Sequence, residues 1–227
     1  MKNRILWIIA AVSLIISAAA VNFMPDTVPM HYDLQGNADR YGSKYEVFIF
    51  SGVVIFFAAF WHGFIAFCSR MQKNAADEKT AAEAGVNAKV LKITAVAVLL
   101  MELAFQIVFI VKILNNADNT ETMPLGLSSW ICGIMGIVLA VVGNVMPKAK
   151  RNGIFGLRTS WSMANDKTWL ASNRFGGAAL FAGGIAITVC SLIAEGVTTL
   201  YIMIGVIIAV TLVSTVYSYM AYRKYSD

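Results

Sequence analysis

The sequence predicts an all-α membrane protein that crosses the bilayer six times. Hydrophobic residues make up 58% of the 227 residues and charged residues only 14%, whereas a soluble domain carries about 25% charged residues. The apolar residues also gather into runs of the length that a bilayer crossing requires, roughly 17–25 residues. Lipid is therefore the expected surrounding of most of the chain.

Six apolar runs divide the chain, and almost all of the charge falls between them. The predicted spans are 5–22, 47–68, 91–113, 128–146, 176–194 and 198–220. The first run resembles a signal peptide in its basic start and small-residue end, and we interpret it as a true span. The link 195–197 is so short that the last two spans form an antiparallel hairpin.

The distribution of basic residues predicts the orientation. With the N-terminus inside, fifteen of the eighteen Lys and Arg residues lie in cytoplasmic segments, and only Arg40, Lys44 and Lys112 lie outside. This asymmetry is the one that the positive-inside rule describes. Both termini and the loop 147–175 are therefore expected in the cytoplasm. The net charge of +5 suits anionic lipid on that side, so no nucleic-acid partner is inferred.

Two regions are predicted from the order of spans and loops. Residues 1–90 hold two spans, an outside loop and a cytoplasmic linker whose short solvated helix is expected to break at Gly85. Residues 91–227 hold four spans and the cytoplasmic loop 147–175. The sequence NFMP at 22–25 is similar to NVMP at 144–147, three spans later. This repetition raises the hypothesis of an inverted 3+3 repeat.

Small residues on two predicted helices indicate close helix packing. Residues three or four apart share a helix face, and small side chains let helix backbones approach closely in lipid. One such set lies on the fourth span and the other on the fifth: Gly133, Gly136, Ala140 and Gly143, and then Gly176, Gly177, Gly183 and Gly184.

The cytoplasmic loop contains the basic, glycine-punctuated stretch 144–161, NVMPKAKRNGIFGLRTSW. Asn165 is expected to cap a helix 166–174, with Asp166 in its first turn, that leads into the fifth span. Trp161 and Trp169 suit the lipid headgroup region, where an indole can be partly wet.

Arg158 is the side chain of this loop that could hold a phosphate or a carboxylate through two hydrogen bonds. The glycines do not form a phosphate loop, because no Gly-Lys-Ser/Thr follows them. Two interpretations stay open: the loop binds lipid or a partner protein, or it folds back and plugs the helix bundle.

The outside loop 23–46 is rich in Pro, Gly, Asp and Tyr. Its His31, Asp33, Gln35, Asn37 and Asp39 alternate as in a calcium loop, but Gly36 is at the fourth position and Lys44 at the twelfth. A zinc site would need more His or Cys. We expect no metal, and a turn-rich cap whose Asp and Asn side chains bond local amides and which a peptide could meet. Its candidate residues are Pro25, Pro29, His31, Asp33, Gly36, Asn37, Asp39 and Tyr41.

Three polar residues fall inside predicted spans. Glu102 lies ~15 Å beyond Lys92 and His62 ~12 Å before Arg70, at ~1.5 Å per residue. The second and third spans are antiparallel neighbours, so His62 and Glu102 could meet, and Gln106 shares a face with Glu102. Intramembrane ionisable residues often mark functional sites, and an interhelical hydrogen bond that fixes packing is the other interpretation.

Both polar loops resemble one family. Residues 143–177, GNVMPKAKRNGIFGLRTSWSMANDKTWLASNRFGG, resemble the signature of the bacterial SdpI family, although Ser160 stands where members often have Pro. Residues 24–44 resemble a domain of unknown function often fused to it, with Tyr32 in place of Phe. The matching positions are Gly143, Asn144, Met146, Pro147, Lys148, Asn152, Gly156, Arg158, Thr159, Trp161, Trp169, Asn173, Arg174, Phe175, Gly176 and Gly177, and Pro25, Pro29, His31, Gly36, Asp39, Tyr41 and Lys44.

The resemblance implies a multi-pass protein of the bacterial plasma membrane that gives immunity to a membrane-active peptide toxin. It also implies a signalling role, in which the protein holds a cytoplasmic regulator. The alternative is a small proton-coupled transporter that uses Glu102 and His62. No enzyme or cofactor is expected, because the sequence offers no nucleophile or metal constellation. The loop residues then expected to meet lipid or a partner are Asn144, Pro147, Lys148, Asn152, Gly156, Arg158, Thr159, Trp161, Trp169, Asn173 and Arg174.

Overall fold

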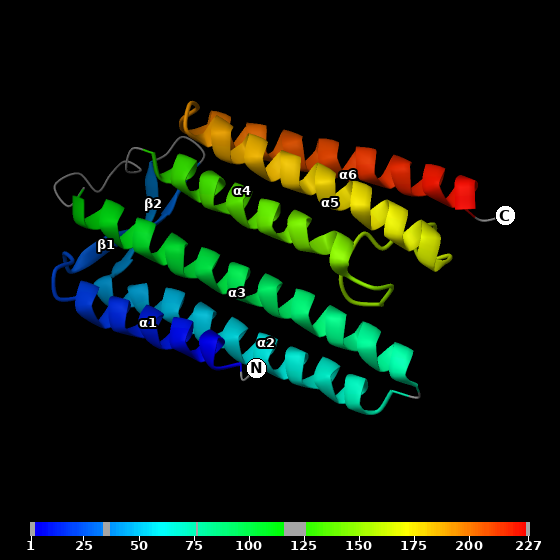
Figure 1. Cartoon of the computed structure of the whole chain (residues 1–227). Coiled ribbons are helices and arrows are strands. Elements are labelled where there is room, and N and C mark those ends of the chain that lie inside the picture. The colour runs from blue at the N-terminus through cyan, green and yellow to red at the C-terminus, as the bar shows by residue number, and fades with distance from the viewer. Residues whose placement is uncertain (1–2, 34–36, 76, 116–125, 226–227) are drawn as a thin grey trace.

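The computed structural model describes residues 3–33, 37–75, 77–115 and 126–225. Its helices lie side by side, and a β-hairpin lies near one end of the bundle (Figure 1). The helices are α1 Arg4–Ala20, α2 Phe48–Lys73, α3 Glu78–Asn115, α4 Leu127–Val145, α5 Asp166–Ser191 and α6 Val197–Tyr225. Short 3-10 turns, η1 Lys44–Val47 and η2 Met146–Lys148, precede α2 and follow α4. Each predicted span therefore corresponds to a helix.

Among the described residues, five helices are long and apolar enough to cross a membrane, namely α2 to α6. The apolar α1 has 17 residues, which is ~25 Å of helix against a hydrocarbon core of ~30 Å. The mostly helical membrane fold is confirmed. The sixth crossing and the cytoplasmic location of both termini stay predictions.

The helices form two groups of three. α1 packs against α2 and α3, α5 packs between α4 and α6, and α3 and α4 lie along each other and join the groups (Figure 1). The hairpin and the α5–α6 turn lie at one end of the bundle, and the loop after η2 and the end of α6 lie at the other. The inverted repeat between the two groups stays a hypothesis.

The prediction of an entirely helical fold missed a hairpin in the outer loop. β1 Thr27–Tyr32 pairs antiparallel with β2 Ala38–Ser43. Val28 is fully buried and packs with residues at the ends of α1 and α3, among them Val21 and Ile113. Pro29 indicated a loop, yet a two-stranded hairpin leaves each strand one unpaired edge, where proline is tolerated.

The predicted break at Gly85 is also wrong, because α3 runs through it without interruption. A Cβ at Gly85 would lie 2.7 Å from Nε2 of Gln72 on α2. The glycine therefore lets α2 and α3 approach each other, and it does not end the helix.

The predicted packing glycines of α4 and α5 lie mostly between these two helices. A Cβ at Gly136 would stand 2.6 Å from the carbonyl oxygen of Gly184, and one at Gly184 would stand 2.5 Å from the backbone nitrogen of Ala140. Gly143 and Gly177 approach each other in the same way. Gly183 instead faces Val206 and Val210 on α6. Close backbone contact between α4 and α5 is thus confirmed.

A buried polar cluster ties α1, α2 and α3 together. Gln106 of α3 is 0% exposed; its Oε1 accepts a 2.6 Å hydrogen bond from Ser13, and its Nε2 donates a 2.8 Å hydrogen bond to Ser17. Ser51 of α2 donates to the Ser13 carbonyl oxygen and shares a 2.8 Å hydrogen bond with Ser17. Because these polar groups satisfy one another, they fix how the three helices pack.

We expect Gln106→Ala to lower the free energy of unfolding by about 2 kcal/mol, because it removes the amide group whose oxygen and nitrogen both form hydrogen bonds in a buried cluster. The midpoint of thermal unfolding in detergent measures this. Thr211→Val on α6 is the control, because within the described residues the exposed Thr211 hydroxyl bonds just the Ile207 carbonyl of its own helix. Equal midpoints for the two variants would show that the cluster does not hold α1, α2 and α3 together.

Candidate functional site

The loop between η2 and α5 is anchored at its C-terminal end by the predicted helix cap. The side chain of Asn165 accepts a 2.9 Å hydrogen bond from the amide of Thr168, and the Asn165 amide donates to the Thr168 hydroxyl at 3.1 Å. This reciprocal pair is a capping box. Asn165 Nδ2 also donates to the carbonyl oxygen of Tyr225 at 2.9 Å, so the start of α5 is tied to the end of α6.

Asn152 shapes the first half of the loop. Its Oδ1 accepts hydrogen bonds from the amides of Ile154 (2.7 Å) and Phe155 (2.8 Å), and its Nδ2 donates to the carbonyl oxygens of Lys150 (2.6 Å) and Phe155 (3.2 Å). An asparagine that bonds its own following backbone in this way stabilises a tight turn. The side chain is fully used within the loop and acts there as a structural residue.

Gly156 and Asn173 hold the centre of the loop against α5. Gly156 has φ +118°, a conformation that favours glycine, and a Cβ there would lie 2.4 Å from Asn173 Oδ1. The same oxygen accepts a 2.7 Å hydrogen bond from the amide of Leu157, and Asn173 Nδ2 donates to the Trp169 carbonyl at 3.0 Å. Asn173 is 0% exposed, so it supports the loop from inside.

Trp169 lies buried beneath the loop. The residue is 2% exposed, and its indole N–H donates a 2.8 Å hydrogen bond to the carbonyl of Ala149. It packs with Val90 of α3 and Val145 of α4. Phe155 and Met163 of the loop pack against this group, so the loop folds over this part of the bundle.

The Arg-Thr-x-Trp segment is attached to α6. The Thr159 amide donates to Ser162 Oγ at 2.9 Å, the Ser162 amide donates to Thr159 Oγ1 at 3.0 Å, and Thr159 Oγ1 shares a 2.6 Å hydrogen bond with Ser218 Oγ on α6. The ring of Trp161 meets that of Tyr219 edge to face, with centroids 5.1 Å apart. Neither Ser162 nor Ser218 was predicted, since a lone serine carries no pattern of its own.

The loop's arginines have different surroundings. Arg151 forms a 2.8 Å ion pair with Asp166 and donates to the Met163 carbonyl at 3.1 Å. Arg158 is exposed, and no hydrogen bond or ion pair holds it within the described part of the chain. Its guanidinium is thus presented to the surroundings by a loop whose other polar groups bond one another.

A second group of predicted residues meets where α4 ends and α5 begins. Asn144, Pro147 and Arg174 line a shallow cavity of about 290 Å³ together with Gly143 and Gly177. Lys148 is exposed beside it. The exposed cations of this end therefore include Arg158 in the loop and Arg174 of α5 at the edge of this cavity.

The outer hairpin presents another set of predicted residues. His31 Nδ1 and Asp39 Oδ1 lie 2.6 Å apart across the strands, both largely exposed. Asp33 Oδ1 accepts from the Asn37 amide at 2.8 Å, as expected for a cap in which Asp bonds local amides. Tyr41 is exposed, Pro29 is buried and Pro25 is half-buried. Gly36 lies outside the described residues.

An ion pair fastens the base of this hairpin. The Lys44 ammonium donates a hydrogen bond to Asp26 Oδ1 at 2.8 Å, and this bond holds the pKa of the Asp26 carboxyl below its ordinary value. The pair is therefore complete above the usual aspartate pKa and is lost as the pH falls through the lowered one.

The predicted meeting of His62 and Glu102 does not occur. His62 Nδ1 accepts a 3.0 Å hydrogen bond from the Trp7 indole on α1. Glu102 Oε2 is buried without a hydrogen-bond partner among the described residues. Gln106 belongs to the serine cluster. The three residues thus lie in separate surroundings because their helix faces point to different neighbours.

We expect Asn173→Ala to loosen the loop while leaving the bundle folded. The Leu157 amide would lose its acceptor, which costs about 1–3 kcal/mol for a buried group, so amides 154–159 should exchange with deuterium about ten times faster or more. Asn144→Ala, at an exposed position near the loop, should leave this exchange unchanged. Equal exchange in both variants would mean that Asn173 does not hold the loop.

Comparison with known proteins finds two family matches and one relative. Residues 148–218 match the SdpI/YfhL protein family, and residues 8–55 match a domain of unknown function, DUF1648. Immunity protein SdpI of Bacillus subtilis (strain 168) is 26% identical over 225 residues, which cover 98% of this chain and 97% of that protein. No solved structure matches.

The resemblance inferred from the two loops is therefore confirmed. The SdpI-family match begins in η2 and ends at Ser218 on α6, so it contains Asn152, Arg158 and Asn173. The similarity and the apolar helices together establish a multi-pass protein of the bacterial cell membrane.

Proposed function

We propose that the protein gives its host immunity to a membrane-active peptide toxin, and that it does so by binding and not by catalysis. The observation that carries the proposal is the similarity along almost the whole chain to an immunity protein. In this proposal the bundle crosses the membrane six times, both termini and the loop after η2 face the cytoplasm, and the hairpin faces the outside.

The geometry supports a binding role for both ends of the bundle. The loop after η2 is stiffened by the internal hydrogen bonds of Asn152, Ser162 and Asn173, and it leaves Arg158 exposed. A guanidinium held in this way suits a phosphate or a carboxylate. At the other end, the hairpin presents His31, Asp39 and Tyr41 on its surface, where a peptide arriving from outside would meet them.

A toxin challenge tests the proposal. A sensitive host that expresses the chain should survive one or more of a panel of secreted membrane-active peptide toxins that kill the same host without it. His31→Ala should reduce survival, whereas Thr27→Ala, at another exposed position of β1, should not. Failure to protect against every toxin of the panel would contradict the proposal.

The other roles stay predictions. Nothing in the described residues favours the signalling role over simple binding. For a proton-coupled transporter, the separation of His62 from Glu102 removes the pair on which that hypothesis was built.

A further inference from the structure

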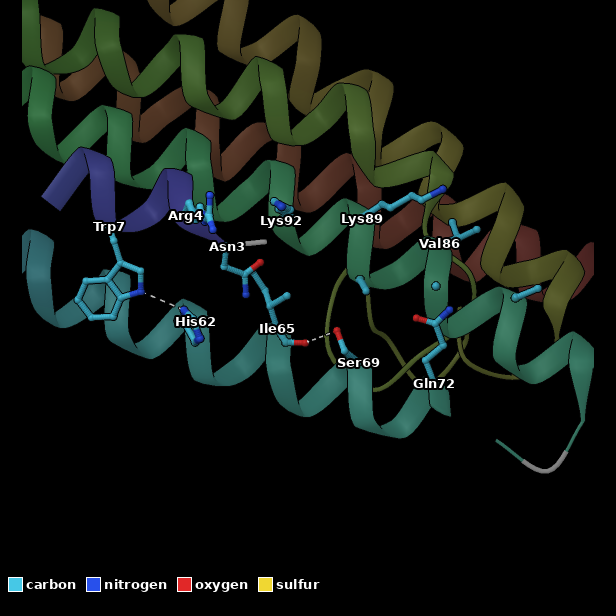
Figure 2. Close-up of a pocket in the computed structure, with 13 residues that line it drawn as sticks. Asn3, Arg4, Trp7, His62, Ile65, Ser69, Gln72, Val86, Lys89 and Lys92 are labelled. Atoms are coloured by element: carbon cyan, nitrogen blue, oxygen red, sulfur yellow. Dashed lines mark hydrogen bonds between the residues drawn. The ribbon is translucent and has the colours of Figure 1, made fainter. Parts of the chain in front are cut away.

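A large cavity lies between α1, α2 and α3, away from both loops. Its volume is about 840 Å³, within the range of ligand pockets in general. Figure 2 shows the lining side chains in a row, with the Trp7–His62 hydrogen bond near one end and Gln72 at the other. None of the polar loop residues discussed above lines it.

The cavity exists because α1 is shorter than its neighbours at this end. Trp7 of α1 and His62 of α2 lie at the same height along the bundle, because their side chains are hydrogen-bonded. From there α2 continues to Lys73, ~17 Å at ~1.5 Å per residue, whereas α1 continues only ~5 Å to Arg4. About 12 Å of the facing surfaces of α2 and α3 is therefore left without α1 against it.

The lining is cationic. Arg4 comes from α1, and Lys89 and Lys92 come from α3; none of the thirteen described lining residues is acidic. Residues 82, 85, 86, 89 and 92 of α3 share this face by their spacing of three or four. Glu83 lines a different cavity on the other side of the helix, together with Asn87 and Arg151. The lining, as far as the structure describes it, thus carries positive charge and no acidic side chain.

The surroundings of the cavity suit a lipid headgroup. Trp7, Ile65 and Val86 give the cavity apolar walls beside its cations, and the adjoining α1 and α2 expose large apolar side chains such as Ile8 and Phe67. Acyl chains can cover those side chains while a phosphate lies among the cations. Basic pockets between membrane helices on the cytoplasmic side are suited to anionic headgroups.

We propose that this cavity binds the phosphate-bearing headgroup of an anionic phospholipid, with Arg4, Lys89 and Lys92 around the phosphate. Arginine can meet two phosphate oxygens at once, and the two lysines add positive charge. The proposal concerns lipid and stands whether or not the protein protects against a toxin.

Native mass spectrometry of the full chain in mild detergent tests the proposal. Phosphatidylglycerol or phosphatidylcholine of the same acyl chains is added in increasing amounts, and bound lipid is counted. We expect phosphatidylglycerol to bind more tightly by on the order of 10- to 100-fold. Millimolar inorganic phosphate should not displace it, because phosphate gains nothing from the apolar walls.

Charge removal separates this site from general attraction. The variant Arg4→Gln/Lys89→Gln/Lys92→Gln should lose the preference for phosphatidylglycerol. The control Lys73→Gln/Lys79→Gln/Arg223→Gln removes the same charge from exposed positions that do not line the cavity and should keep the preference. The single variant Lys89→Gln, at an exposed position, should weaken the preference in a chain that still folds.

Three results would overturn the proposal. Equal binding of the two lipids, equal loss of preference in the two triple variants, or tight binding of inorganic phosphate without any preference for phosphatidylglycerol would each do so. The last result would instead make the cavity a site for soluble anions.

Discussion

Replacing Gly184 by alanine should lower the free energy of unfolding by about 3 kcal/mol, the upper end of what overpacking usually costs. The new Cβ would lie 2.5 Å from both the Ala140 nitrogen and the Gly136 oxygen, and these backbone atoms cannot rotate away as a side chain can. Helices α4 and α5 would have to separate along the contact that joins them most closely.

Two other glycines provide a graded comparison for this prediction. Gly205→Ala on α6 meets no atom within 4 Å and should not destabilise the protein. Gly183→Ala meets the tip of the Val210 side chain at 2.7 Å and should have an intermediate effect, because that side chain can move. The measurement is the midpoint of thermal unfolding in detergent. A Gly184→Ala midpoint equal to that of Gly205→Ala would contradict the tight α4–α5 contact.

Arg158→Ala should reduce survival in the toxin challenge to that of cells without the protein, with the amount of protein in the membrane unchanged. The side chain makes no hydrogen bond or ion pair within the described residues, so its loss should leave the fold intact. Losing a charged hydrogen-bonded contact costs about 1.5–3 kcal/mol, roughly 10- to 150-fold in affinity for the partner.

Two variants separate geometry from charge at this position. Arg158→Lys keeps the charge but cannot form the two parallel hydrogen bonds of a guanidinium, so it should protect only in part. Lys150→Ala removes an exposed charge a short way along the same loop and should protect fully. Full protection by Arg158→Ala would show that the exposed guanidinium is not the contact that matters.

The helices were predictable from the sequence because lipid demands long apolar runs whose boundaries are marked by charge. The cap at Asn165 and the glycine faces of α4 and α5 were predictable for a related reason, since both depend on spacing within one helix. The hairpin was not, because its prolines indicate a loop and its burial depends on Ile110 and Ile113, about eighty residues away.

Several residues of the loop could be picked out from the sequence, but their roles could not. Asn152, Asn173 and Trp169 were all expected to face a partner, yet the structure uses them inside the loop. These bonds join residues whose relation depends on how the loop folds over α5. Similarly, residue counting gives the distance of His62 and Glu102 from the ends of their predicted spans. Helix packing decides the direction in which each side chain points.

The central claim is that the loop carrying Arg158 faces the cytoplasm and the hairpin faces the outside. Gly153 is exposed, with open space at its Cβ position, so Gly153→Cys should be tolerated. A membrane-impermeant thiol reagent applied to whole cells should leave Gly153→Cys unlabelled until the cells are permeabilised, and should label Asn37→Cys of the hairpin at once. Labelling of Gly153→Cys in intact cells, above that of the unsubstituted chain, would contradict the account.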